Sequence, residues 1–261
     1  MNFIEEYYNN RDEDARLTSR HGSVEFITTV KYIRECLALA GGSKILEVGA
    51  GTGRYSIKLA REGCAVTAVE LVPHNIDVLN SKLDGTETLE VFQGNALDLS
   101  FLADESFDVT LLLGPMYHLY TFGDKKQALS EALRVTKKGG CVLVAYCMNE
   151  PTIIQYCFIG GGLGDALESD LLTEDWHCKS EPKEVFELVR TEDIAALDEA
   201  VGAERIKLVA TDGAAHYLRE LLDNMDDATF EKWLEYHLAT CERQDLIGAS
   251  NHTLDILRKN I

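Results

Sequence analysis

The residues Ile45-Leu46-Glu47-Val48-Gly49-Ala50-Gly51-Thr52-Gly53 carry the strongest structural signal in this sequence. The first four form a short, mainly apolar run, which is typical of a buried strand. The last five have a glycine at every second position, and glycine allows positive φ angles and lets a ligand approach where a Cβ would stand. Gly53–Glu62 then reads as a helix, whose free N–H groups and positive dipole end would face this turn. We therefore expect a strand, a ligand-binding turn and a helix.

Strands and helices alternate along the rest of the chain. Short β-branched runs are separated by longer helical segments, and this rhythm predicts right-handed crossovers and a parallel sheet covered on both faces. The expected fold class is α/β: a doubly wound, mostly parallel seven-stranded sheet, Rossmann-like, with helical lid insertions. The expected strands are Lys44–Val48, Ala65–Leu71, Thr88–Gln93, Phe107–Leu113, Gly140–Cys147, Glu204–Ala210 and His252–Leu257. The expected helices are Gly53–Glu62, Pro73–Leu83, Asp124–Thr136 and Ile194–Val201.

Three regions differ from this pattern. Residues 1–43 have apolar positions at helical spacing and are expected to form an N-terminal helical lid. Residues 44–261 would form the ligand-binding α/β domain, with insertions at about 149–190 and 212–250. The first insertion reads as irregular and acidic: 12 acids and 3 bases lie between Gly161 and Ala200, which predicts a solvated flap. The second insertion reads as two helices between the last two strands.

Composition limits the classes of partner and the compartment. The chain has 261 residues with 44 acidic and 25 basic side chains, an excess of acid that disfavours a large nucleic-acid surface or an anionic membrane. No apolar run approaches the roughly 20 residues of a membrane span, and Met1–Glu6 carries acid where a signal peptide would carry base. The seven cysteines are scattered without a C-x-x-C pair, which predicts reduced thiols and no metal site. We expect a cytoplasmic protein without membrane or nucleic-acid partners.

The ligand expected at the glycine turn is a nucleoside. Seventeen residues after Gly53, the second strand ends in Glu70, an acid that can bind both hydroxyls of a ribose. Glu47, two residues before the first glycine, would repel a pyrophosphate but can hold an ammonium group, directly or through water. The spacing G-x-G-x-G places Arg54 where a dinucleotide-binding fold needs its third glycine, and the sequence has no G-K-[ST] motif.

With these residues the sequence resembles the class I S-adenosylmethionine-dependent methyltransferases. Glu47-x-Gly49-x-Gly51-x-Gly53 is similar to the first motif of that family, and Glu70 to its ribose-binding acid. Gln93–Asp98 resembles the third motif, with Asn95 where the family usually has an Asp that pairs with the adenine amine. Phe107–Gly114 resembles the strand-four motif, and Lys137–Gly140 the turn before strand five. The resemblance covers roughly residues 40–147.

The resemblance implies S-adenosylmethionine as cofactor and S-adenosylhomocysteine as its product. An N-terminal helical segment often closes over the cofactor in this family, so Arg20 or His21 would reach the methionine carboxylate, although a capped surface helix explains the same residues. The expected cofactor-binding residues are Glu47, Gly49, Ala50, Gly51, Gly53, Glu70, Leu71, Asn95, Ala96, Leu113 and Arg20.

Two residues just after strand four are the catalytic candidates. The sulfonium is a potent methyl donor, so an enzyme must mainly align the acceptor and exclude water; a base is needed only if the acceptor arrives protonated. His118 would be that base, or it hydrogen-bonds the backbone and packs under the lid. Tyr117 would line the acceptor pocket or simply pack. Gly114–Tyr117 lacks the polar N-P-P-Y-like motif of nucleobase and amide N-methyltransferases, which disfavours that class.

The predicted function is methyl transfer to an O or N atom of a small-molecule acceptor by in-line displacement. Lid segments suit an enclosed pocket, and the acidic flap suggests neutral or cationic acceptors. Three alternatives stay open: an RNA or protein methyltransferase of the same fold, a non-catalytic S-adenosylmethionine-binding module, and a nicotinamide-dependent oxidoreductase, which Arg54 disfavours. The motifs assign neither the acceptor nor the oligomeric state.

Overall fold

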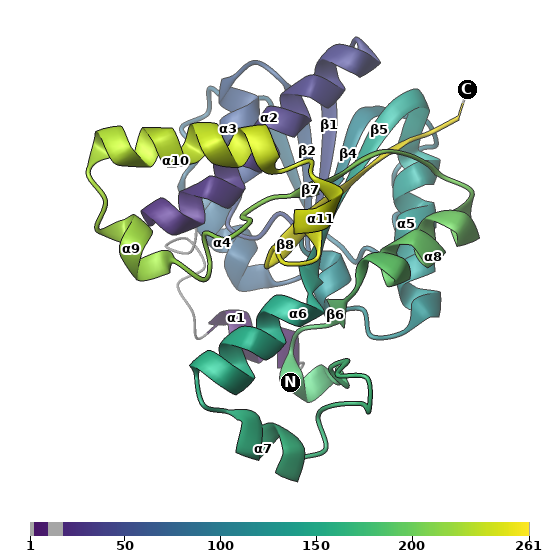
Figure 1. Ribbon diagram of the computed structural model, residues 1–261. Helices are drawn as coiled ribbons and strands as arrows, with labels where there is room; N and C mark the ends of the chain where they lie inside the picture. The colour runs from purple at the N-terminus through teal and green to yellow at the C-terminus, as the bar shows by residue number, and fades with distance from the viewer. Residues whose placement is uncertain (1–2, 10–17, 261) are drawn as a thin grey trace.

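A single sheet forms the centre of the structure, a computed structural model that describes residues 3–9 and 18–260 (Figure 1). Its strand order is β3-β2-β1-β4-β5-β8-β7, and all neighbours are parallel except β8, which runs antiparallel to β5 and β7. A two-residue strand, β6, pairs with the end of β5, so the described residues form eight strands where the sequence predicts seven. The strands are β1 (Lys44–Val48), β2 (Ala65–Glu70), β3 (Leu89–Gln93), β4 (Phe107–Leu112), β5 (Thr136–Met148), β6 (Leu188–Val189), β7 (Glu204–Ala210) and β8 (His252–Arg258).

Helices cover both faces of this sheet. Every residue of β4 is buried, as expected for a parallel strand between two helical layers. On one face pack α2 (Arg20–Ala40) and α3 (Arg54–Arg61), with α4 (Pro73–Ser81) beside α3. On the other face pack α5 (Phe122–Val135) and α8 (Thr191–Val201). The doubly wound α/β prediction is confirmed.

The fifth strand begins earlier than the sequence predicts. It starts at Thr136 instead of Gly140, so α5 ends at Val135. Thr136 pairs with Phe107, and the register then shifts before Cys141 pairs with Val109. The predicted turn at residues 137–140 is therefore an irregularity inside β5 and not a connection before it.

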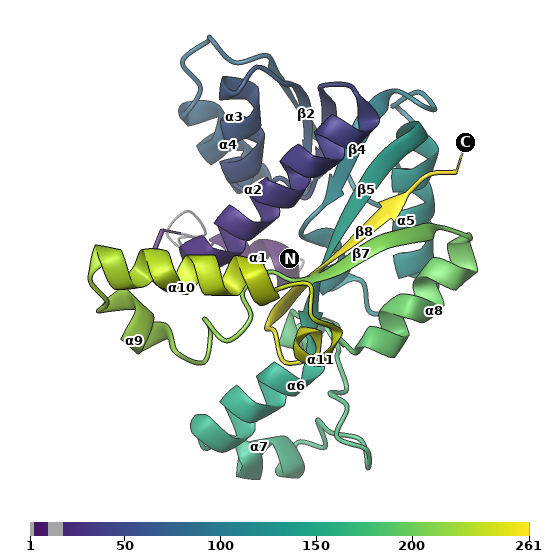
Figure 2. The same ribbon diagram turned by 45° about the horizontal axis from the view of Figure 1, so that its top comes forward.

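The last two strands of the chain enclose a helical insertion, as predicted. It contains three helices instead of two: α9 (Arg219–Asp223), α10 (Asp227–Thr240) and the single turn α11 (Gln244–Ile247). In Figures 1 and 2, α10 lies against α2. The predicted N-terminal lid is described in part, as α1 (Phe3–Asn9) and α2, because residues 10–17 lie outside the described ranges.

Two expectations from composition can be compared with the structure. All seven cysteines are free thiols, and six of them are buried, which fits the prediction of reduced core residues. Within residues 3–9 and 18–260, the helices are all too short or too polar to cross a membrane.

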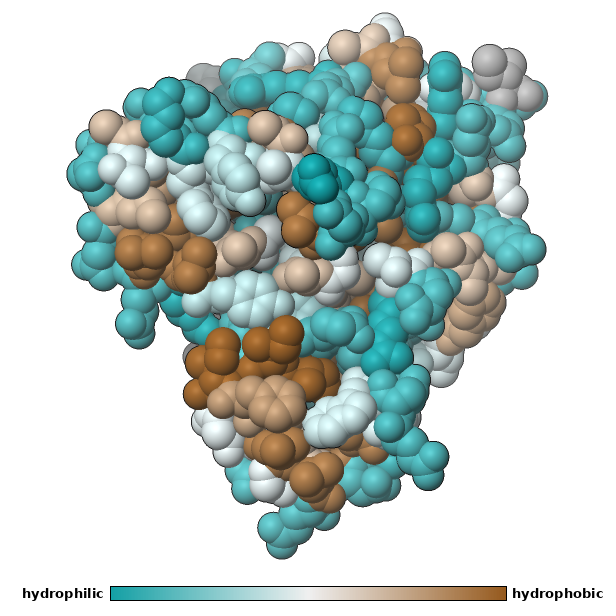
Figure 3. Space-filling model, viewed as in Figure 1, coloured by the Kyte–Doolittle hydropathy of each residue, from teal (hydrophilic) through white to brown (hydrophobic). Residues whose placement is uncertain are grey.

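The insertion between residues 149 and 190, here called the flap, is more regular than its sequence suggests. It contains α6 (Asn149–Thr152), the π-helix η3 (Ile153–Ile159), α7 (Leu163–Glu168) and the short 3₁₀ helix η4 (Pro182–Glu184), and forms a lobe beyond the end of β5 (Figure 2). Ile153, Cys157 and Ala166 pack together inside this lobe. Its outer face is apolar, as Figure 3 shows, with exposed side chains of Ile154, Phe158, Ile159, Leu167 and Trp176.

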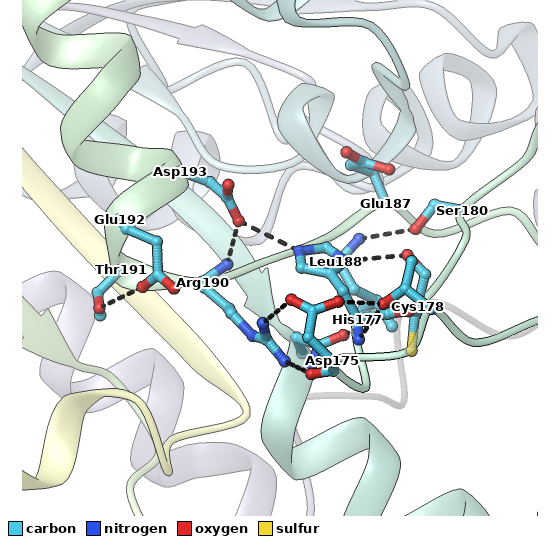
Figure 4. A network of polar contacts seen from close by, with 12 residues as sticks. Asp175, His177, Cys178, Ser180, Glu187, Leu188, Arg190, Thr191, Glu192 and Asp193 are labelled. Carbon is cyan, nitrogen blue, oxygen red and sulfur yellow. Dashed lines mark hydrogen bonds and ion pairs between the residues drawn. The ribbon is translucent and has the colours of Figure 1, made fainter.

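Arg190 fastens the base of the flap (Figure 4). Its guanidinium donates to the Glu150 carboxylate at 2.6 Å, and to the side-chain and backbone oxygens of Asp175 at 3.0 and 2.8 Å. The Asp193 carboxylate at the start of α8 accepts from the Arg190 backbone N–H at 2.7 Å and lies 3.2 Å from His177 Nε2. These contacts join the two ends of the flap to each other and to α8.

We expect Arg190→Ala to loosen the flap while the sheet stays folded. The substitution removes three hydrogen bonds of a partly exposed cation, worth about 1–2 kcal/mol together after screening by solvent. Trypsin cleavage after Lys179 and Lys183 should therefore be roughly tenfold faster, because local opening limits access to the protease. Lys232→Ala, which breaks an exposed ion pair with Glu235 on α10, is the control. Equal cleavage rates in both variants would contradict the anchoring role.

Candidate active site

The glycine turn between β1 and α3 leaves open space at its middle position. Gly49, Gly51 and Gly53 all have positive φ, at 78°, 54° and 83°. A Cβ on Gly49 would lie 2.6 Å from Pro115 Cδ, and a Cβ on Gly53 would lie 2.5 Å from Leu79 Cγ, so packing requires both glycines. A Cβ on Gly51 would meet no atom within 4 Å. The middle of the turn therefore faces open space, here called the cradle.

Glu70 fixes this turn from the end of β2. Its carboxylate accepts from the Gly51 N–H at 2.7 Å with one oxygen and from the Val72 N–H at 2.8 Å with the other. The residue is only 5% exposed, and burial raises the pKa of its carboxyl, although the hydrogen bonds from Val72 and Gly51 oppose this. Each carboxylate oxygen can accept more than one hydrogen bond, so both remain able to bind hydroxyl groups.

Glu47 lies beneath the turn. It is 1% exposed and accepts a hydrogen bond from the Ser56 hydroxyl of α3. Burial raises the pKa of its carboxyl to about 8, against the opposing effect of Ser56. At neutral pH the carboxyl is therefore mostly protonated, and a nearby cation would favour its ionised form.

The other predicted cofactor residues differ in their surroundings. Asn95 is exposed, and its side-chain oxygen accepts from the Leu97 backbone N–H at 3.0 Å, which closes an Asx turn after β3. Ala50 and Ala96 are buried, while Leu71 and Leu113 are partly buried at the ends of β2 and β4. No contact of these residues tests their predicted roles.

Arg20 is directed towards the insertion after β7. Its guanidinium donates to the Asp227 carboxylate at 2.7 Å and lies over the Phe230 ring, 5.5 Å from its centroid. Its neighbour His21 lines the cavity described next. The predicted contact of Arg20 with a methionine carboxylate therefore requires a different side-chain arrangement and stays a prediction.

A cavity of about 590 Å³ lies between the sheet edge, the flap and the N-terminal helices. Its walls are largely apolar or aromatic, with Tyr7 and Tyr8 from α1 and Ile153 and Tyr156 from the flap. Tyr117 joins the two regions, because it lines the cavity and belongs to the short helix η2 (Pro115–His118), whose Pro115 contacts the position of Gly49.

Both ring nitrogens of His118 are hydrogen-bonded. Nδ1 donates to the Val185 carbonyl of the flap at 2.7 Å, so Nε2 is the acceptor for the Tyr8 hydroxyl at 3.0 Å. Burial lowers the pKa of His118, which keeps the ring neutral. Val185 has φ of 69°, a strained conformation for a β-branched residue. His118 thus connects α1, η2 and the flap. This arrangement corresponds to the interpretation in which His118 hydrogen-bonds the backbone and packs under the lid. Its role as a base stays a prediction.

Sequence reasoning missed an ionisable group on the cavity wall. His252 Nδ1 lies 2.9 Å from an Asp212 carboxylate oxygen and 3.4 Å from a Glu25 carboxylate oxygen. These residues come from β8, the segment after β7, and α2. The sequence contained a signal for the placement of His252. Because β8 is antiparallel, its first residue, His252, lies at the carboxyl ends of the parallel strands, where ligands bind in such sheets.

Comparison with known proteins agrees with this geometry. Residues 46–144 match the sequence profile of a family described as a methyltransferase domain. A demethylmenaquinone methyltransferase of Clavibacter sepedonicus is 34% identical over 116 residues, 44% of this chain and 45% of that protein. A protein of Methanosarcina acetivorans named "Probable ribosomal RNA small subunit methyltransferase A" is 46% identical over 79 residues, 29% of each chain. The chain thus spans less than half the length of these relatives.

A solved structure supports the fold over most of the chain. The S-adenosylmethionine-dependent methyltransferase of Archaeoglobus fulgidus superposes with a TM-score of 0.56 and 15% identity, covering 90% of this chain and 94% of that one. The sheet order, glycine turn and strand-end acid are those of the Rossmann-like methyltransferase fold. Residues 46–144 thus match a methyltransferase domain, and the chain has the fold of solved S-adenosylmethionine-dependent methyltransferases.

The open space at Gly51 leads to a direct prediction about cofactor binding. Gly51→Ala should weaken S-adenosylmethionine binding at least tenfold, because the new Cβ enters the cradle, and should cost about 1–2 kcal/mol of stability from the positive φ. Gly41→Ala is a matched control: Gly41 ends α2 with φ of 68° and also has no atom within 4 Å of its Cβ position. Calorimetric titration and thermal unfolding measure the two effects. Equal affinities in both variants would place the cofactor elsewhere.

Proposed function

We propose that this protein transfers the methyl group of S-adenosylmethionine to a small molecule bound in the cavity between the flap and the N-terminal helices. The observation that carries this proposal is the connection between the two regions through η2, with Pro115 against Gly49 and Tyr117 in the cavity wall. The volume of about 590 Å³ suits a small ligand, since such sites commonly measure about 300–1,000 Å³.

Each region has a distinct task in this proposal. When bound, S-adenosylmethionine supplies an electrophilic methyl group. Glu70 would hold the ribose hydroxyls, Glu47 would favour the cationic part of the cofactor, and Asn95 would hold the adenine. The aromatic and apolar walls of the cavity exclude water and orient the acceptor, and orientation alone can contribute about 7–11 kcal/mol to such reactions.

An RNA acceptor is the second candidate, because two relatives are named for ribosomal RNA. The net charge of −19 disfavours it, since RNA binding depends on clustered cations. A test with total tRNA and ribosomal RNA separates the two: label transfer from methyl-labelled S-adenosylmethionine to RNA, lost at high salt, would favour RNA over a small molecule.

Cofactor binding is the first test of the proposed function. Calorimetric titration should show binding of S-adenosylmethionine and S-adenosylhomocysteine, with NAD as a negative control. Glu70→Gln should weaken both by roughly 10–100-fold, because hydrogen bonds to a charged group contribute about 1.5–3 kcal/mol. Glu90→Gln changes an exposed acid on the neighbouring strand β3 and should leave the affinities unchanged. Absence of binding by the folded protein would reject the proposal.

The raised pKa of Glu47 predicts that cofactor binding releases protons. At pH 7 this carboxyl is mostly protonated, and the positive charge of the cofactor should lower its pKa and drive the proton off. Affinity should therefore rise with pH up to about 8 and then level off. Titrations in buffers of different ionisation enthalpy measure the released proton, which Glu47→Gln should abolish. A proton count that stays the same in this variant would contradict the assignment.

A further inference from the structure

His252 is fixed on the cavity wall by two carboxylates. Its Nδ1 lies 2.9 Å from Asp212 and 3.4 Å from Glu25, and its ring centroid is 5.9 Å from that of Tyr117. Nδ1 is turned towards the carboxylates, so Nε2 is the ring nitrogen that they do not use; the Cys147 side chain of the paired strand β5 also hydrogen-bonds to the ring, and both residues line the cavity. This orientation is that of a histidine used in proton transfer.

Asp212 is itself held in place. It is 4% exposed, and the oxygen that does not face the His252 ring accepts from the Ser250 hydroxyl at 2.7 Å and the His252 N–H at 3.0 Å. The Ser250 oxygen also accepts from the Gly213 N–H at 2.9 Å, which ties the segment after β7 to the start of β8. Both carboxylate oxygens of Asp212 are therefore committed to fixing His252.

We propose that His252 takes the proton from the methyl acceptor, with Asp212 as its positioning residue, so that the acceptor is a hydroxyl or thiol compound. This inference rests on the proposed function. The acceptor oxygen or sulfur forms a bond to the methyl carbon, and the sulfur of the cofactor keeps the electron pair of the broken S–C bond. The O–H or S–H proton goes to Nε2 of His252. The resulting imidazolium then loses that proton to solvent.

His252 suits this task better than His118. The two groups that hydrogen-bond to the His118 ring, the Tyr8 hydroxyl and the Val185 carbonyl, are uncharged, and burial lowers the pKa of the ring. A proton transferred to His118 would be a buried charge without a counter-charge, whereas the imidazolium of His252 faces Asp212 and Glu25.

The charged groups around His252 determine how the rate of methyl transfer should depend on pH. Burial alone would lower its pKa, but Glu25 from α2, Cys147 from β5 and Asp212 raise it well above the ordinary value. Two further groups face this region: Tyr117 from η2, and His216 from the segment after β7, whose pKa burial lowers to about 4. His216 is thus neutral around pH 7. A base acts only when deprotonated, so methyl transfer should increase with pH up to the pKa of His252.

The first measurement needs no acceptor. Histidine ring signals of the 261-residue protein with S-adenosylhomocysteine, followed by NMR against pH, should give His252 a pKa above 6.5, the ordinary value. Asp212→Asn should lower that pKa by at least one unit, because it removes the closest negative charge. The signal of His252 is assigned by its absence in His252→Gln, and His177→Gln in the flap is the control that should leave it unchanged. A His252 pKa that does not move in Asp212→Asn would overturn the proposal.

The second measurement compares three acceptors of the same ring size. The probes are 2-naphthol, 2-naphthalenemethanethiol and 2-(dimethylamino)naphthalene, with methyl-labelled S-adenosylmethionine. Label should enter the naphthol or the thiol, which carry the proton that His252 removes, and not the tertiary amine. His252→Gln should reduce this transfer at least 100-fold, and Asp212→Asn should shift the inflection of the pH–rate profile to lower pH. A merely structural role of Asp212 would lower the rate without moving the inflection.

Several outcomes would overturn the inference. One is equal labelling of the tertiary amine, and another is full activity of His252→Gln. A third is activity that a chelator abolishes and Zn²⁺ or Mn²⁺ restores, which would make His252, Asp212 and Glu25 a metal site. If none of the probes is labelled, the NMR titration alone decides. Calorimetry with S-adenosylmethionine on each variant separates this inference from the proposed function: cofactor binding retained without the predicted titration rejects only the role of His252.

Discussion

The hydrogen bond from the Gly51 N–H to the Glu70 carboxylate, 2.7 Å long, is the contact on which the site depends. It joins the turn after β1 to the end of β2, two neighbouring parallel strands, and so fixes the backbone that would face a cofactor. A carboxylate this deeply buried is costly unless it is hydrogen-bonded, and the N–H groups of Gly51 and Val72 meet that requirement. The turn is therefore ordered before any ligand arrives, which reduces the entropy lost on binding.

The core of the fold could be predicted because its signals are local. The run Ile45–Val48, the alternating glycines and the buried stretch of β4 each identify their own element, and the parallel order follows from the crossovers between them. The early start of β5 escaped prediction because residues 137–140 form an irregularity of pairing with β4, and such a shift depends on the partner strand. The helices of the flap were not predicted, because Gly160–Gly162 and the many acids around them are typical of an irregular segment.

The cluster of His252, Asp212 and Glu25 at the cavity could not be predicted for a different reason. Asp212 and His252 are 40 residues apart, and Glu25 lies far from both in the sequence. Only the antiparallel direction of β8 brings His252 to the carboxyl ends of the parallel strands. No periodicity or spacing in the sequence predicts that these three side chains lie together. Class I methyltransferases share the sheet and the glycine turn, so the choice of acceptor is expected to depend on such non-local residues.

The order of the chain has a consequence for how the protein matures during synthesis. The elements that hold the glycine turn and its acid lie between residues 44 and 112 and can pair as soon as that stretch has left the ribosome. The cavity needs Tyr7 and Tyr8 near the beginning of the chain and His252 near its end. Its closure is a contact of very high sequence separation, which forms late because loop entropy must be lost first. The nascent protein should therefore form its glycine turn well before it can close the cavity.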